Sequence, residues 1–425
     1  MRSLRKFAVF GLLFLVAASF VFAGGGGQQQ AAGGKATVQF WHALSGANGQ
    51  LLDSIIDKFN GSQSTANVVG TFQGDYWEAS AKAYAAISAG EAPDILMMGA
   101  DMVISVIGEE GVLADLNPYL KKSNIDADDF IEGFVWDYRH NGGLYAIPFG
   151  RSTPVVYINR DMLDAQGLKP PTNWDEWKQV ANALVQKDAN GQITRYGMTM
   201  PYDTWYFYMI VAQAGGKFIN DAKTAMGCID DGTALEAFTF YQDMAKTGAL
   251  YFDVAGGPAR QLFLDGKAGM HINSVSNMNS IHTGAKFKYE VIWVPQGKVR
   301  VVPSGGNALG MLNSSKVKDA SWSFLDWCLK SPDGIVEFIL GTGYNPITNS
   351  MARSDAIQKS WIENPFRKVA FDQLQYASDR GHRVVQTVPI MNELFVFEQA
   401  IMYDLKDVKT QLDILNRSII DILKE

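Results

Sequence analysis

The sequence predicts an α/β protein built from two lobes, and three observations support this prediction. The chain has 425 residues, and the roughly 400 that follow its apolar N-terminal stretch are too many for one ordinary hydrophobic core. Residues 37–98 follow the order strand, helix, strand, helix, strand, which is typical of a βαβαβ unit. Near residue 150 a new strand begins, and helical patterns then dominate. This change indicates a second lobe.

The first lobe is predicted from the periodicity of its apolar residues. Thr37–Trp41 has the pattern of a strand, and apolar residues then recur at helical spacing across Leu51–Phe59. Asn67–Phe72 is a second predicted strand, followed by a helix over Trp77–Ala89. Ile95–Met98 is a short, wholly apolar run of the kind that is buried in a parallel sheet.

The second half of the chain is predicted to be richer in helices. Leu144–Gly150 marks the change of pattern, and Val301–Met311 returns to apolar, glycine-rich sequence. The other predicted elements are strands at Val155–Ile158 and Phe287–Trp293, helices at Trp174–Gln186 and Ala234–Ala245, and a last helix with one apolar face from Val408 to Ile422.

The amino terminus has the pattern of a secretory signal peptide. Three basic residues lie within the first six positions, an uncharged and largely apolar stretch covers Phe7–Phe22, and Val21–Ala23 suits a signal peptidase. A membrane anchor is the alternative, although the stretch is short for one. With no Cys near Ala23, we expect no lipid attachment. We therefore expect cleavage after residue 23, a flexible Gly/Gln leader at residues 24–34, and a periplasmic protein.

Composition excludes one class of partner and leaves the cysteines open. The formal net charge is −7, and removal of residues 1–23 makes it −10. Nucleic acid is therefore an unsuitable partner, because phosphates require a basic surface. Cys228 and Cys328 are the only cysteines. Two buried free thiols and a single disulfide are both compatible with the sequence.

The sequence contains no pattern that indicates an enzyme, a metal site or a cofactor. The five histidines are scattered without metal-ligand spacing, and no nucleophile elbow, P-loop or Rossmann glycine pattern is present. Glu109–Glu110 and Asp128–Asp129 are acidic pairs that a glycosidase could use, but such pairs are expected by chance among 44 acidic residues. We therefore predict a protein without catalytic residues, metal ligands or a cofactor.

Aromatic and polar residues follow the predicted strands of the first lobe. Trp41 ends the first strand, Tyr76 precedes the second helix, and Asp101 follows the third strand. Ligands of open α/β sheets bind beyond the carboxyl ends of the strands, so these positions are expected to converge. Sugar rings stack on aromatic faces, and their hydroxyls need polar partners. Each residue also has a structural alternative: a core position for Trp41, a helix start for Tyr76 and a helix cap for Asp101.

Several motifs in one order resemble the family 1 extracellular solute-binding proteins of ABC importers. The resemblance covers nearly the whole chain after the leader and is strongest at Ile147–Asp161. The other matching segments are Val38–Ala43, Phe59–Asn60, Gly90–Ile95, Pro171–Glu176, Gly266–Met270, Gly341–Ile347 and Glu363–Pro365.

The resemblance implies a type II periplasmic-binding-protein fold with the ligand cleft between two α/β lobes. Crossovers are expected near Gly150–Thr153 and Gly297–Val301. The N-terminal lobe would comprise residues 35–150 plus about 300–350, and the C-terminal lobe residues 151–299 plus about 351–425. We expect a monomer that closes on its ligand by hinge motion and then docks on the transmembrane subunits of an ABC permease.

The resemblance is closest to the glycerol-3-phosphate-binding branch and its sugar-binding relatives, and it implies a set of ligand contacts. These are Tyr76, Ser152, Ser274, Gly306 and Tyr344, with stacking aromatics at Tyr202 and Trp205. Together with Trp41, Asp101 and Asn392 they form the expected ligand site. The acidic contact of that branch has no clean match, because Asp101 lies one place on.

The ligand class depends on Asn392, which takes the place of the arginine expected to bind phosphate in that branch. An amide suits a sugar hydroxyl better than a phosphate dianion, so a mono- or oligosaccharide is the predicted ligand. Glycerol 3-phosphate or a glycerophosphodiester is the alternative, with Arg151 or Arg383 as the phosphate partner. A glycosidase and a purely structural or receptor-docking surface protein are two further alternatives.

Overall fold

The computed structural model describes residues 34–100, 103, 111–253, 257–378, 384 and 386–424. The predicted signal peptide, nearly all of the predicted leader, and Glu109, Glu110, Asp101 and Arg383 lie outside these residues. All elements below belong to the compact unit that begins at Ala36. Among the described residues, no helix is long and apolar enough to cross a membrane.

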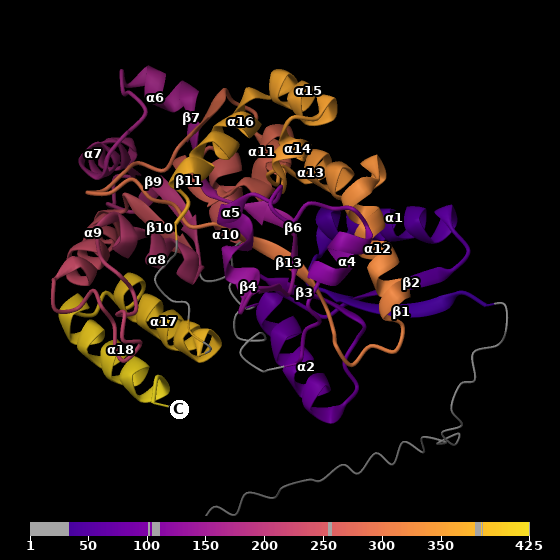
Figure 1. Ribbon diagram of the computed structural model, residues 1–425. Coiled ribbons are helices and arrows are strands. Elements are labelled where there is room, and N and C mark those ends of the chain that lie inside the picture. Colours follow the sequence, from indigo (N-terminus) through magenta and orange to yellow (C-terminus); the bar gives the residue numbers. More distant parts are fainter. Residues whose placement is uncertain are drawn as a thin grey trace, which may run out of the picture. The chain divides into compact units, whose positions relative to one another are not determined.

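A first sheet of five strands has the order β2-β1-β3-β13-β6 (Figure 1). Strands β2 and β3 both run parallel to β1, β13 runs antiparallel to β3, and β6 runs antiparallel to β13. The strands are β1 (Ala36–His42), β2 (Ala66–Phe72), β3 (Ile95–Gly99), β6 (Ile147–Ser152) and β13 (Gly305–Met311). Every residue of β3 is buried, as expected for an apolar strand covered on both faces.

Helices cover this sheet and share one hydrophobic core with it, and we call this assembly the first lobe. They are α1 (Gly46–Ser62), α2 (Tyr76–Ala89), α4 (Asn117–Lys122), α5 (Glu132–Val135), α12 (Lys318–Lys330), α13 (Glu337–Thr342), α14 (Asn349–Ala352) and α15 (Asp355–Glu363). A small hairpin joins β4 (Arg139–His140) and β5 (Gly143–Leu144). Helix α1 buries Leu52, Ile55 and Phe59, because apolar residues three and four positions apart share one helix face.

A second sheet has six strands, with the order β10-β9-β11-β7-β12 and β8 paired to β9. These strands are β7 (Pro154–Asn159), β8 (Gln186–Lys187), β9 (Ile193–Pro201), β10 (Leu250–Asp253), β11 (Ala268–Ser274) and β12 (Tyr289–Ile292). Strands β9, β10 and β11 are mutually parallel where they pair, whereas β7 is antiparallel to both β11 and β12.

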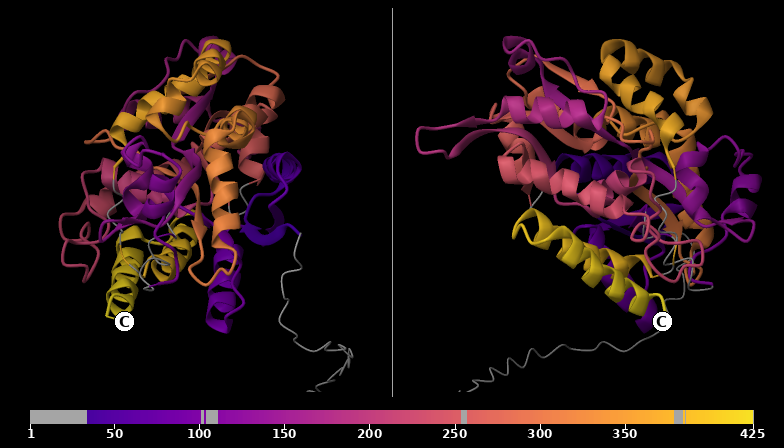
Figure 2. Two further views of the ribbon diagram at one scale, coloured as in Figure 1. Left: turned by 45° about the vertical axis from the view of Figure 1, so that its right-hand side comes forward. Right: turned by 90° about the vertical axis from the view of Figure 1, so that its left-hand side faces the viewer.

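The helices around the second sheet form the second lobe with it. They are α6 (Arg160–Ala165), α7 (Trp174–Leu184), α8 (Thr204–Gln213), α9 (Thr233–Thr247), α10 (Gly257–Leu264), α11 (Met278–Gly284), α16 (Pro365–Asp372), α17 (Thr387–Met402) and α18 (Val408–Ile422). Helices α17 and α18 lie side by side, as Figure 1 and the left view of Figure 2 show. The apolar face predicted for the last helix is confirmed, since Val408, Leu412, Leu415 and Ile419 are buried.

The chain passes between the two sheets at three places in the part that the structure describes. Strand β6 ends at Ser152 in the first sheet, and β7 begins at Pro154 in the second, so the first passage occupies Thr153. The return runs through residues 293–304, between β12 and β13. The last passage differs from the expected position near residue 350, because Ile357 and Trp361 pack in the core of the first lobe. It therefore follows α15.

The predicted elements match the structure apart from their ends. The helix expected to reach Gln186 stops at Leu184, because Val185 is extended and Gln186 pairs with β9. Of the two possibilities for the cysteines, free thiols are confirmed: Cys228 and Cys328 are both buried and unpaired. Burial raises the pKa of the Cys228 thiol to about 12, so this thiol is not a reactive thiolate at neutral pH.

Candidate functional site

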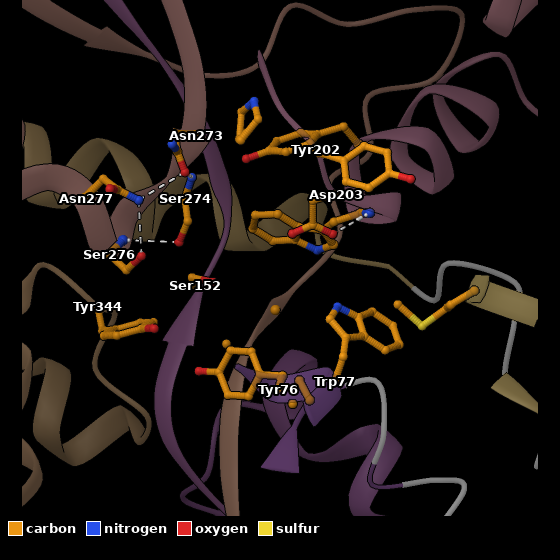
Figure 3. A pocket seen from close by; sticks show the side chains of 18 residues that line it. Tyr76, Trp77, Ser152, Tyr202, Asp203, Asn273, Ser274, Ser276, Asn277 and Tyr344 are labelled. Atoms are coloured by element: carbon orange, nitrogen blue, oxygen red, sulfur yellow. Dashed lines mark hydrogen bonds between the residues drawn. The ribbon is translucent and has the colours of Figure 1, made fainter. Parts of the chain in front are cut away.

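A cavity of about 310 Å³ lies between elements of the two lobes (Figure 3). From the first lobe it is lined by the start of α2, the ends of β3 and β6, the start of β13 and the loop after α13. The second lobe contributes the end of β9, the start of α8, the end of β11, the turn that follows it, and α17. The lining residues are Tyr76, Trp77, Gly99, Ala100, Ser152, Pro201, Tyr202, Asp203, Trp205, Tyr206, Asn273, Ser274, Ser276, Asn277, Gly305, Gly306, Tyr344 and Met391.

Sheet topology explains why these segments meet. Strand β3 ends at Gly99, and β9 and β11 end at Pro201 and Ser274. The carboxyl ends of strands in open α/β sheets form the usual ligand crevice. Strand β13 runs antiparallel to β3, so its first residues, Gly305 and Gly306, lie beside the end of β3. The amide of Ala100 donates to the carbonyl of Gly306 at 2.9 Å and joins the two segments.

Two tyrosines from the first lobe enter the cavity, and one of them is held by a buried amide. The side-chain nitrogen of Asn307 donates to the Tyr76 hydroxyl at 3.0 Å, and its oxygen accepts from the amide of Gly150 at 3.0 Å. Asn307 is fully buried, so these two bonds satisfy an amide that would be costly to leave unpaired. Burial raises the pKa of the Tyr344 phenol, whereas hydrogen bonds with Tyr76 and Ser276 act in the opposite direction. Burial also raises the pKa of Tyr76, so both phenols are neutral at physiological pH.

A group of amides and hydroxyls from the second lobe faces these tyrosines (Figure 3). The Asn273 oxygen accepts from the Ser274 amide at 2.7 Å and from the Asn277 side chain at 3.0 Å. The Asn277 oxygen in turn accepts from Arg260 at 2.7 Å. The Ser276 amide donates to the Ser274 hydroxyl at 3.2 Å. This network fixes the orientation of each amide before a ligand arrives.

A buried histidine, His271, contacts Asn273 and so supports this network. The side-chain nitrogen of Asn273 lies 2.9 Å from Nε2 of His271, and the Thr199 hydroxyl lies 2.9 Å from Nδ1. Burial lowers the pKa of His271 to about 3, so the ring is neutral at physiological pH. An amide nitrogen can only donate, which makes Nε2 the acceptor and places the ring proton on Nδ1, facing Thr199. His271 is thus a structural support for Asn273.

The start of α8 provides aromatic surface and one charge. Asp203 is the N-cap of α8, and its carboxylate accepts from the Trp205 amide at 2.9 Å. The Trp205 ring packs closely against the first lobe, since a Cβ added to Gly305 would lie 2.9 Å from it. The Tyr202 hydroxyl donates to the carbonyl of Phe395 at 2.8 Å. Among the described lining residues, Asp203 is the only charged one.

Seven of the ten sequence-predicted site residues line this cavity. They are Tyr76, Ser152, Tyr202, Trp205, Ser274, Gly306 and Tyr344. Their contact with a ligand stays a prediction, and Asp101 lies outside the described residues.

Trp41 and Asn392 do not line the cavity. Strand β1 alternates its faces, and the half-buried Trp41 packs against the core of the first lobe. On α17 it is Met391 that lines the cavity. Asn392 is exposed, because successive helix residues point about 100° apart. The argument that relied on an amide at residue 392 therefore loses its support.

Sequence reasoning missed several lining residues, among them Trp77, Asp203, Asn273, Asn277 and Met391. Signals for some of them existed. Trp77 is the neighbour of Tyr76, and Asp203 follows Tyr202 directly, at the N-cap of a helix. Asn273 and Asn277 flank Ser274 in sequence, but only the turn after β11 shows that all three face one space.

Arg151 does not line the cavity, although it follows Gly150 at the passage between the lobes. Its fully buried guanidinium donates to the Tyr138 hydroxyl at 2.6 Å and to the Ser304 hydroxyl at 3.0 Å. It also lies over the rings of Phe134 and Tyr138. Arg151 thus ties the two strands that pass between the lobes to the first lobe. The other suggested phosphate partner, Arg383, lies outside the described residues.

The acidic pair that the structure describes is not placed for catalysis. Asp129 accepts from the amide of Ser350 at 3.0 Å, and Asp128 is exposed; neither lines the cavity. In the described part of the chain, no group of three or more His, Cys, Asp or Glu side chains is arranged to hold a metal ion.

Comparisons with known proteins give a consistent picture. Residues 54–365 match the model of a family described as bacterial extracellular solute-binding protein. The sn-glycerol-3-phosphate-binding periplasmic protein UgpB of Agrobacterium fabrum is 25% identical over 404 residues, which cover 88% of this chain and 90% of that protein.

Two solved structures share the fold. UgpB from Mycobacterium tuberculosis, in complex with glycerophosphocholine, has a TM-score of 0.80 at 22% identity and covers 92% of this chain and 99% of its own. The GacH receptor of Streptomyces glaucescens, solved unliganded and with acarbose, has a TM-score of 0.80 at 20% identity with the same coverage.

Proposed function

The chain belongs to the bacterial extracellular solute-binding proteins, and we propose that it captures a small neutral carbohydrate in the cavity between its lobes. Members of this family are not enzymes; they bind a solute for an ABC importer. The structural relatives share the two-lobed binding-protein fold, as the sequence predicts. The carbohydrate would be held by closure of the lobes and passed to the membrane permease.

The observation that carries this proposal is the chemistry of the cavity lining. Aromatic rings, neutral amides and hydroxyls dominate it. Aromatic rings offer apolar faces to the C–H side of a sugar ring, and Asn and Ser side chains can both donate to and accept from its hydroxyls. Asp203 adds an acceptor that forms stronger, charge-assisted hydrogen bonds with hydroxyl donors.

Glycerol 3-phosphate is the second candidate, because the curated relatives with this name are 25% identical to the chain. The described lining is unfavourable for this ligand. A phosphate dianion needs cationic or bidentate donors, whereas the only charged lining residue described is the anionic Asp203. Arg151 already donates to Tyr138 and Ser304. This argument replaces the one from Asn392 and again favours a neutral ligand.

A thermal-shift screen tests the ligand class directly. The protein would be heated with mono- and disaccharides, glycerol 3-phosphate or glycerophosphocholine. A ligand that binds only the folded state adds about 2.7 kcal/mol at a hundred times its dissociation constant. We expect at least one saccharide to raise the melting temperature. A rise with glycerol 3-phosphate alone would overturn the carbohydrate proposal, and a rise with glycerophosphocholine alone would assign the site to a glycerophosphodiester.

Asp203→Asn should weaken saccharide binding about tenfold, or by about 1.4 kcal/mol, because a charged acceptor becomes a neutral one. The fold should tolerate this change, since Asn is as good an N-cap as Asp. Titration calorimetry with the saccharide found in the screen would measure the change.

Asp407→Asn is the matched control for this substitution. Asp407 is the N-cap of α18, where it accepts from the Thr410 amide at 2.8 Å, and it does not line the cavity. We expect unchanged affinity for this variant. Equal affinities of the Asp203 variant and the wild type would remove Asp203 from the ligand contacts.

The proposed function also requires export of the chain and a defined division into two lobes. We propose that residues 1–23 are removed on export and that the mature protein acts as a periplasmic monomer. The first lobe would comprise residues 35–152 and about 304–363, because residues 351–363 share its core. The second lobe would comprise residues 154–303 and about 365–425.

A further inference from the structure

Trp77 reaches from the first lobe to the second, along one edge of the cavity. Helix α2 packs on β3 of the first sheet, yet the Trp77 ring packs against the core of the second lobe. Its ring meets that of Phe395 on α17, with centroids 5.2 Å apart and planes 81° apart. Trp77 lines the cavity, and in Figure 3 it lies on the opposite side from Asn273 and Asn277.

The backbone that carries Trp77 is fixed by a capping box. The carboxylate of Asp75 accepts from the amides of Trp77 at 2.8 Å and Glu78 at 2.9 Å. The Glu78 side chain accepts in turn from the amide of Asp75. Because both ends of this box lie in the first turn of α2, the direction in which Trp77 leaves the helix is set before any ligand binds.

Phe395 is held just as firmly from the second lobe. The Tyr202 hydroxyl donates to its carbonyl at 2.8 Å, and the two rings lie 4.8 Å apart. Phe395 is thus fixed beside a residue that lines the cavity. Two rings that are each held by their own lobe, and that touch edge to face, form a contact between the lobes at this edge.

The other flank of the cavity is also closed by contacts between the lobes. The side-chain nitrogen of Asn279 on α11 donates to the carbonyl of Gly341 at 2.6 Å, at the end of α13. Arg367 of α16 donates to the carbonyl of Leu340 at 2.8 Å and to the Asn279 oxygen at 2.7 Å. These bonds lie beside the polar side of the cavity, since Ser276 and Asn277 directly precede α11.

A cavity bounded on both flanks admits a ligand of limited length. Its volume of about 310 Å³ lies at the lower end of ligand cavities, which span about 300–1,000 Å³. An oligosaccharide grows by adding rings along its length, and a further ring on the Trp77 side would have to separate Trp77 from Phe395. We infer that the Trp77–Phe395 pair sets the length of the saccharide and restricts the site to one or two sugar rings. This inference rests on the proposed carbohydrate function.

Titration calorimetry on the full protein tests this length limit with two series of saccharides of increasing length. One series runs from glucose to maltotetraose, and the other from mannose to mannotetraose. For the wild type we expect binding of a mono- or disaccharide and at least tenfold weaker binding of the tri- and tetrasaccharide. In Trp77→Ala and Phe395→Ala, the trisaccharide should bind at least tenfold more tightly than it binds to the wild type. Trp77→Leu is a milder variant should the alanine variants not fold.

Trp327→Ala is the matched control, because Trp327 is half-buried, packs edge to face on Phe59 at 5.7 Å and does not line the cavity. Its affinities for the saccharides of both series should match those of the wild type. Wild-type protein that binds trisaccharides as tightly as disaccharides would overturn the length limit and leave the carbohydrate function intact. Unchanged selectivity in all folded Trp77 and Phe395 variants would overturn the role of the pair. Failure of every saccharide, here and in the screen, would overturn the carbohydrate function itself.

Discussion

Replacing Gly306 by alanine is expected to destabilise the protein by about 2–5 kcal/mol and to abolish ligand binding under conditions that retain the fold. Gly306 has φ of +96°, a region that costs an L-residue about 1–2 kcal/mol. A Cβ at this position would also overlap the carbonyl oxygen of Gly150 on the neighbouring strand. Overpacking of this kind typically costs about 1–3 kcal/mol.

The effect on binding follows from the position of Gly306 in the site. It lines the cavity, pairs with Arg151 across the two strands that lead to the lobe passages, and accepts from the Ala100 amide. A shift of β13 away from Gly150 would therefore separate Gly305 from Ser152, its partner on β6, and both of these residues line the cavity. Chemical unfolding would measure the loss of stability, and calorimetry the loss of affinity.

Gly90→Ala is a control that separates the cost of a positive φ from the cost of steric overlap. Gly90 caps α2 with φ of +75°, and a Cβ there would meet nothing within 4 Å. This control carries only the conformational cost of about 1–2 kcal/mol and should bind ligand normally. Equal destabilisation of the two variants would show that the strands relax around the new methyl group, and the argument for a rigid floor to the cavity would fail.

The fold could be predicted because its signals are local or carried by ordered motifs. Ile95–Met98 is a short run of apolar residues, and such a run is typical of a strand in the interior of a sheet. The structure confirms this, since every residue of β3 is buried. The face of α18 followed from the spacing of Val408, Leu412 and Leu415. The last passage between the lobes follows α15 and not residue 350. The sequence could not show this, because no local pattern distinguishes a helix that packs on one lobe from a helix that packs on the other. Ile357 and Trp361 are apolar in either case.

The resemblance predicted many of the residues that line the cavity, but a place in a matching motif did not guarantee it, since Trp41 lies in one and does not line the cavity. Ser152 lies in the strongest matching segment, at the first expected crossover, and it lines the cavity, as does Gly306, which lies outside the matching segments. Asn392 was placed by a single alignment far from any such motif, and on a helix one residue decides between the cavity and solvent. The contact between Trp77 and Phe395 could not be predicted, because the two residues are more than three hundred positions apart in the chain. Contacts of this range depend on the packing of the whole fold.

Glu398→Gln is expected to make the protein more stable relative to the wild type as the pH rises, by up to about 1.4 kcal/mol for each pH unit. Glu398 is fully buried on α17, and among the residues that the structure describes neither carboxylate oxygen has a hydrogen-bond partner. Burial raises its pKa well above the usual range, and the negative charge of Asp203 raises it further. The neighbouring phenols of Tyr202 and Tyr241, whose pKa values are raised by burial and then by Glu398, provide no positive charge.

The sign follows from the two protonation states. In the unfolded chain Glu398 ionises above about pH 4.3, whereas in the folded protein it stays protonated up to its raised pKa. Its favourable contribution is therefore complete below about pH 4.3 and is lost as the pH rises towards the folded value. Glutamine does not titrate, so the variant lacks this loss. Between pH 5 and pH 7 the stability of the variant relative to that of the wild type should therefore increase with pH.

Urea unfolding at pH 5, 6 and 7 measures this difference, with Glu393→Gln as the control. Glu393 lies on the same helix but is partly exposed, so its replacement removes a carboxylate that already has access to water. We expect the control to follow the wild type at all three pH values. A Glu398 variant whose advantage is the same at pH 5 and pH 7 would mean that Glu398 ionises as readily in the folded protein as in the unfolded chain. Water or a cation would then have to reach its carboxylate in the folded protein.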